Sequence, residues 1–141
     1  MTKAPENFRE QSATTENGST DPVRILHGVT VLVAADQPTV TDEQGALDLL
    51  GESWQSGATL LVVPVRRLDD RFFDLRTGLA GAVLQKFVNY RMQVAILGEI
   101  SDHLAYSDAL RAFVNESNRG QQVWFVDDLD QLADRLAVGG S

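Results

Sequence analysis

The chain has 141 residues, of which 43% are hydrophobic and 23% are charged, and its formal net charge at pH 7 is −8. This length and apolar content fit one globular domain with a buried core and leave little room for two. The negative charge argues against nucleic acid or an anionic membrane surface as the main partner, because both require a basic footprint. The chain has no cysteine, which excludes disulfides, thiolate metal ligands and cysteine catalysis.

The first 20 residues differ in composition from the rest of the chain. They are rich in Thr, Ser, Asn, Glu and Gln and contain one aromatic residue, Phe8. This composition predicts a disordered tail over residues 1–20, followed by a single α/β domain over residues 21–141. Neither a signal peptide nor a membrane-spanning run is visible, so we expect a soluble cytoplasmic protein with no membrane partner.

Five short β-prone runs predict a five-stranded mixed sheet. The runs VRIL and VTVLVA are separated by His27 and Gly28, which is typical of a tight hairpin. The other three runs each follow a helical pattern, so right-handed crossovers should make these strands parallel. They are residues 59–63, 93–97 and 122–126.

Four helices are predicted, either on one side of the sheet or split over both sides. The first opens with a capping box at Thr41 and Gln44 and ends at Gly57. The third has Ser107 as its N-cap and Gly120 just past its end. The fourth is capped by Asp127 or Asp128. The apolar face of the first helix consists of Ala46, Leu47, Leu49, Leu50 and Trp54.

The second helix lies in the stretch from Leu68 to Tyr90, in which a loop of alternating charge precedes an apolar segment. Apolar positions cover more than half of the helix circumference, so either flanking helices cover it or it contacts another chain, for example in a homodimer. A start at Phe72 would place Arg76 within the apolar arc, where a guanidinium is costly. We therefore predict that Thr77 is the N-cap of this helix.

The loop over residues 64–76 interleaves four arginines with three aspartates. It could bind an anion at the helix N-terminus, or its charges could pair locally. Arg71, Arg76, Thr77 and the Gly78 amide are the expected donors to an anion or a partner.

Three further residues are candidate contacts. Gly98 and Glu99 follow the fourth strand, at the edge where open α/β sheets bind ligands. Asn118 lies in the block ESNRG, where either helix capping or a contact with a partner explains it. No catalytic residue, metal site or cofactor is predicted, because the two histidines, His27 and His103, lack further ligands at useful spacing.

The segment RTGLAGAVL, residues 76–84, resembles the Asp-Ser-Ser-Gly-Leu motif of STAS domains, the anti-sigma-factor antagonists and their relatives. The order of elements over residues 23–138 is also similar to that of this family. The resemblance implies that Thr77, the hydroxyl residue before the glycine, is a phosphoacceptor for a partner kinase. The motif's aspartate is absent, since Leu75 and Arg76 stand in its place.

A closer resemblance is to a bacterial family of short proteins known as a domain of unknown function. It rests on the blocks FFDLRTGLAG, LQKFVNYR, AILG and ESNRG, and it implies no activity. Together these patterns predict a non-enzymatic, STAS-like regulatory module that binds a protein, for example in an anti-sigma pathway. The alternative is a small-molecule or anion-binding domain, or an enzyme, that uses the arginine-rich loop.

Overall fold

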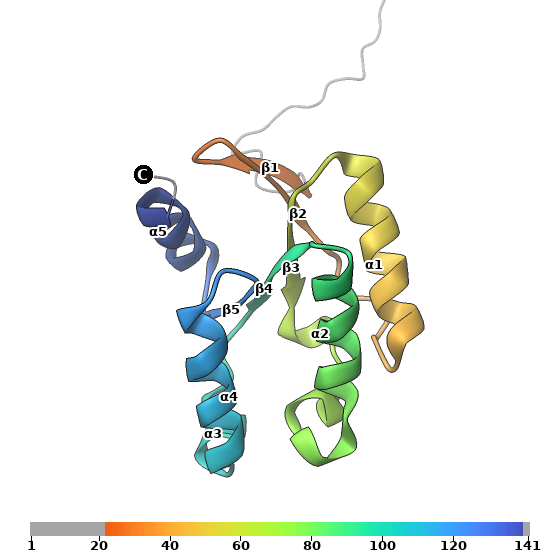
Figure 1. The fold of residues 1–141 in the computed structure, drawn as a ribbon, viewed down its shortest axis with the longest axis vertical. Coiled ribbons are helices and arrows are strands. Elements are labelled where there is room, and N and C mark those ends of the chain that lie inside the picture. Colours follow the sequence, from red (N-terminus) through yellow and green to blue (C-terminus); the bar gives the residue numbers. More distant parts are fainter. Residues whose placement is uncertain (1–21, 140–141) are drawn as a thin grey trace, which may run out of the picture.

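The structure is a computed structural model that describes residues 22–139. The predicted tail over residues 1–20 lies outside the described residues. The fold is α/β with a five-stranded mixed sheet in the order β1-β2-β3-β4-β5, which confirms the predicted α/β class and the mixed sheet (Figure 1). β1 is antiparallel to β2, and every later pair is parallel. The strands are β1(Val23–Leu26), β2(Val29–Val33), β3(Leu60–Pro64), β4(Gln93–Leu97) and β5(Val123–Val126).

The predicted hairpin is confirmed. His27 has φ 49° and Gly28 has φ 80°, so both turn residues are left-handed, as the favoured two-residue hairpin turn requires. This turn sets the register that pairs Leu26 with Val29.

The described residues form five α-helices, one more than predicted. The additional helix, α3(Ser101–Ala105), has five residues, which is too short to give a periodic apolar pattern. The Glu99 carboxylate accepts a hydrogen bond from the Ser101 amide at 3.0 Å and satisfies the first turn of this helix. The other helices are α1(Glu43–Ser56), α2(Leu79–Asn89), α4(Asp108–Arg119) and α5(Leu129–Gly139).

The helices lie on both faces of the sheet. Because the strand order is sequential, each right-handed crossover places its helices on the same face, and α1, α2, α3 and α4 pack there (Figure 1). α5 follows the last strand and covers the opposite face with Leu132 and Leu136. Along the central strand β3, Leu60 to Val63 are fully buried, and each contributes about 1.5–3 kcal/mol through burial.

The predicted helix boundaries differ from the structure in detail. The N-cap of α1 is Asp42 and not Thr41, because Asp42 is extended and its carboxylate accepts from the amides of Gln44 and Gly45. The prediction that Trp54 belongs to the apolar face is wrong, because its side chain is 53% exposed and packs edge to face on Tyr90, with ring centroids 5.5 Å apart. The left-handed Gly57 ends α1 as predicted.

The caps predicted for α4 and α5 lie at the expected residues. Ser107 caps α4 as predicted, with its Oγ accepting from Leu110 N at 3.0 Å. Gly120 ends that helix in an extended conformation, φ −92° and ψ −166°, and not in the left-handed one. Of the two candidates for α5, Asp128 makes the cap, because its carboxylate accepts from Gln131 N at 2.8 Å.

The apolar arc of the central helix α2 covers less of the helix circumference than the sequence pattern implies. Phe72 and Phe73 are buried in a preceding 3₁₀ turn and not in the helix. α2 packs against α1, and Figure 1 shows it between α1 and the pair α3 and α4. Flanking helices therefore account for its apolar face. Within residues 22–139, no helix has the length and apolarity that are needed to cross a bilayer.

Candidate functional site

The loop between β3 and α2 folds as three successive 3₁₀ turns, Val65–Arg67, Asp70–Phe73 and Leu75–Thr77. The second and third turns open with the same Asp-x-Arg unit. In the first unit, the Asp69 carboxylate accepts from the Arg71 amide at 2.9 Å. In the second, the Asp74 carboxylate accepts from the Arg76 amide at 3.2 Å. Each aspartate therefore caps a turn, and the loop is held in one conformation.

The arginines of these units pair with the same aspartates. Arg71 Nε donates to Asp69 Oδ1 at 3.1 Å, and its Nη2 donates to the Thr41 carbonyl at 3.4 Å. Arg76 donates to both carboxylate oxygens of Asp74, at 3.0 and 2.9 Å. Local pairing thus accounts for both arginines, although exposed pairs of this kind stabilise a fold only weakly.

The pairing alters the titration of the loop. Hydrogen bonds from the backbone and side chain of Arg71 lower the pKa of Asp69. The side-chain hydrogen bond from Arg76 lowers the pKa of Asp74, and the same bond raises the pKa of Arg76. Both aspartates are therefore ionised in the folded loop at neutral pH.

We expect the folded loop to loosen only in strong acid. A depressed folded pKa means that the stabilisation is fully present above the unfolded pKa and is lost as pH falls through the folded value. Carboxyl ¹³C NMR titration should therefore show Asp74 titrating below its ordinary value in the wild type. In Arg76→Gln its midpoint should move up toward that value. An unchanged midpoint in Arg76→Gln would contradict the assigned cause.

Thr77 joins the loop to α2. Its Oγ donates a hydrogen bond shared between the carbonyl oxygens of Arg71, at 2.7 Å, and Asp74, at 2.8 Å. The same oxygen accepts from the Leu79 amide in the first turn of α2, at 3.2 Å. The residue at the N-cap position is Gly78, with φ 79°, so the predicted cap was wrong by one residue. Thr77 Oγ nevertheless accepts a hydrogen bond from an amide of the first turn, as an N-cap residue would.

The predicted site residues do not come together in one place. Arg71, Thr77 and Gly78 line a hollow of about 400 Å³ beside the N-terminus of α1, while Arg76 lines a second hollow. A third hollow, of about 620 Å³, contains Gly98 and Glu99. Asn118 lies in the last turn of α4, and its side-chain oxygen accepts from the Phe125 amide of β5 at 2.7 Å.

The third hollow lies at the carboxyl ends of β3, β4 and β5. Five carboxylates and one arginine line it, and that arginine, Arg66, lies 3.8 Å from Asp36. An anion would meet mainly negative charge there. Gly98 has φ 142°, and a Cβ on it would approach Val65 Cγ2 to 2.8 Å, so close packing explains the glycine. The carboxylates are Asp36, Glu99, Asp127, Asp128 and Asp130.

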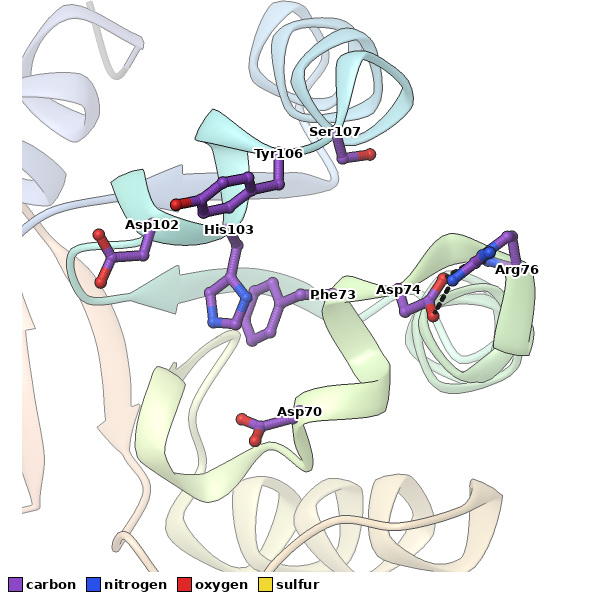
Figure 2. A pocket seen from close by; sticks show the side chains of 8 residues that line it. All are labelled: Asp70, Phe73, Asp74, Arg76, Asp102, His103, Tyr106 and Ser107. Atoms are coloured by element: carbon purple, nitrogen blue, oxygen red, sulfur yellow. Dashed lines mark hydrogen bonds and ion pairs between the residues drawn. The ribbon is translucent and has the colours of Figure 1, made fainter.

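The second hollow, which we call the aromatic hollow, lies between the loop and α3 (Figure 2). Its volume is about 620 Å³. The rings of Phe73 and His103 stack with centroids 4.3 Å apart and planes at 18°. Sequence reasoning missed this hollow because its far wall comes from α3, which was not predicted. It is lined by Asp70, Phe73, Asp74, Arg76, Asp102, His103, Tyr106 and Ser107.

These features define a small α/β domain with a sequentially ordered sheet and a structured charged loop at its strand-end edge. Residues 27–136 match the family described as Domain of unknown function (DUF4180), and the chain belongs to that family. No curated protein and no solved structure matches the chain. Across residues 22–139, no three His, Cys, Asp or Glu side chains are grouped so as to hold a metal ion.

Proposed function

We propose that the chain is a non-enzymatic, STAS-like regulatory module of a bacterial cytoplasmic signalling pathway. It binds a protein partner of kinase or anti-sigma type through the loop over residues 65–78 and the N-terminus of α2. The order of elements supports this proposal: a strand pair is followed by alternating helices and strands, as in STAS domains. The place of Thr77 immediately before Gly78 at the start of α2 supports it further.

The observation that carries the proposal is the double role of the exposed Thr77 hydroxyl. Oγ donates to the loop and accepts from α2, so it couples the conformation of the loop to the start of the helix. A phosphoryl group on Oγ removes the donated proton and adds up to about two negative charges at the helix N-terminus, where the dipole favours them. Arg71 and Arg76 then have a second anionic partner that competes with Asp69 and Asp74.

The competing function, small-molecule or anion binding, has less support. In open α/β sheets the ligand crevice forms where the strand order reverses, and the order β1 to β5 contains no reversal. The hollow at the strand ends is mainly acidic, and the loop arginines are already paired with aspartates. These observations favour a protein surface over an anion site.

We expect Thr77→Asp to change the set of captured proteins without unfolding the domain. An aspartate can accept from the Leu79 amide, but it cannot donate to the Arg71 and Asp74 carbonyls. The substitution should therefore lower the free energy of unfolding by about 1 kcal/mol and change the conformation of the loop. The measurement is affinity capture from a lysate of the native host cells, with wild-type and Thr77→Asp baits compared by quantitative mass spectrometry.

Thr77→Ser is the matched control, because serine keeps the hydroxyl and should capture the wild-type set of proteins. Circular dichroism of the three baits checks that each is folded. The proposal fails if folded Thr77→Asp and wild-type baits capture the same proteins in the same amounts. It also fails if Thr77→Ser changes the set as much as Thr77→Asp does.

A further inference from the structure

We infer that the aromatic hollow receives an arginine side chain of the protein partner. The inference rests on the proposed protein-binding function and specifies the chemistry of the partner. The hollow adjoins the proposed binding loop, because Asp70, Phe73, Asp74 and Arg76 of the loop form one of its sides. Residues of α3 and of the turn after it form the other side (Figure 2).

The hollow has a flat aromatic wall on a rigid support. Phe73 belongs to the buried core, and its ring holds the His103 ring in a stacked arrangement. Tyr106 also lines the hollow and is 91% exposed, an unusual exposure for so large a ring. An exposed tyrosine beside a fixed aromatic stack is the kind of anchor on which protein interfaces concentrate binding energy.

The charge of the hollow is complementary to a cation. Asp74 is paired with Arg76, but Asp70 and Asp102 have neither an ion pair nor a side-chain hydrogen bond with any residue of the described range 22–139. These two carboxylates come from the loop and from α3, on the two sides of the hollow (Figure 2). The net charge of −8 adds long-range attraction for a basic partner.

The lining of the hollow favours a guanidinium over an ammonium group. A guanidinium is planar, stacks on aromatic faces and carries five donors, whereas an ammonium group is a compact charge with three donors. The volume of about 620 Å³ is ample for one such side chain and part of its backbone.

The test is an NMR titration of the full ¹⁵N-labelled chain with the peptide acetyl-Gly-Arg-Gly-Arg-Gly-amide. Saturable shifts are expected at the amides around Asp70, His103 and Tyr106. The double variant Asp70→Asn/Asp102→Asn should weaken binding about tenfold, since two exposed charge pairs are lost. Tyr106→Ala should weaken it about threefold through loss of the cation–π contact.

Matched controls separate this site from general charge attraction. The double variant Asp127→Asn/Asp130→Asn removes the same charge from the strand-end hollow and should leave the affinity unchanged. The corresponding citrulline peptide keeps the planar group without its charge and should not bind, and the lysine peptide and spermine should bind more weakly. The inference is overturned if the peptide gives no saturable shifts, if the control variant weakens binding equally, or if citrulline, lysine or spermine binds as well as arginine.

The peptide test is independent of Thr77. If the arginine peptide binds as expected but Thr77→Asp captures the same proteins as wild type, the arginine-binding inference is supported and the proposed phosphorylation switch is contradicted. If Thr77→Asp changes the captured set but the peptide does not bind, the regulatory role stands and the arginine inference falls.

Discussion

Replacement of Arg67 by alanine is expected to destabilise the domain by about 3 kcal/mol. Arg67 is one of two buried polar or charged residues in the described range, and only 2% of its surface is exposed. Its Nη1 donates to the Ala35 carbonyl at 3.0 Å, and its Nη2 lies 3.8 Å from a carboxylate oxygen of Glu52 on α1. Alanine leaves a cavity at the junction of the β2 end, the loop and α1.

Most of this loss should come from packing and not from charge. The Glu52 carboxylate is half exposed and its distance to Arg67 is long, so the ion pair is weak. The buried Nε of Arg67 has no hydrogen-bond partner among the described residues, which adds an uncompensated desolvation cost to the native state. Arg67→Met fills most of the volume and removes that cost, so it should lose less than about 1.5 kcal/mol.

Urea unfolding of wild type, Arg67→Ala, Arg67→Met and Arg66→Ala provides the measurement. Arg66 is the matched control, because it is the adjacent arginine and its side chain is 85% exposed, with Asp36 as a distant ion-pair partner at 3.8 Å. Its replacement should change the free energy of unfolding by no more than about 0.5 kcal/mol. Equal losses for Arg66→Ala and Arg67→Ala would contradict a packing role for Arg67.

This contrast also shows why the loop could not be predicted from sequence. Arg66 and Arg67 are adjacent members of one charged segment, and their residue type gives no sign that one is buried and the other exposed. The difference arises because a 3₁₀ turn over Val65–Arg67 directs successive side chains to different sides of the chain. Such a turn is held by tertiary contacts and has no periodic pattern of its own.

The sheet could be predicted for the opposite reason. β3, β4 and β5 are runs of mainly buried aliphatic or aromatic residues, and β1 and β2 flank a two-residue turn at His27 and Gly28. The helix α3 was not predicted, because its five residues are too few to show the repeating apolar positions that mark a helix. The aromatic hollow could not be predicted either, since α3 places His103 on Phe73 and precedes Tyr106, which lines the same hollow.

The candidate residues lie at surface or junction positions, but their grouping depends on the tertiary path of the chain. Glu99 caps α3, and Gly98 allows β4 to end close to Val65. Arg71 and Arg76 lie in the same short loop, yet they line different hollows, because the buried Phe72 and Phe73 lie between them in the chain. Sequence spacing alone does not encode such a separation.

The free edge of β5 is the place where the second large effect is expected. Val94 N donates to the Gln122 carbonyl and Gly98 N donates to the Val126 carbonyl, so the even-numbered residues of β5 direct their backbone groups to β4. The Phe125 amide therefore points away from the sheet, at an edge that is able to pair with another strand.

Asn118 closes that edge, so Asn118→Ala is expected to destabilise the domain by about 1–3 kcal/mol. Its side-chain oxygen accepts from the Phe125 amide at 2.7 Å, and its carbonyl accepts from Arg135 Nη2 at 2.6 Å. Alanine leaves the partly buried amide without its acceptor, while the contact of Arg135 with the main chain survives. Urea unfolding measures the loss, and Asn118→Asp, which keeps a side-chain acceptor, should stay within about 1 kcal/mol of wild type.

The same variant should also self-associate, because the unpaired amide of Phe125 becomes available to a strand of a second molecule. Light scattering coupled to size exclusion should show a concentration-dependent rise in mass for Asn118→Ala that is absent for Asn118→Asp. Both variants lack the native amide group, so a role of that NH₂ group in binding a partner would affect them alike. A stable, non-associating Asn118→Ala would show that the side chain does not guard the edge, and the partner-contact interpretation of Asn118 would then be the one to pursue.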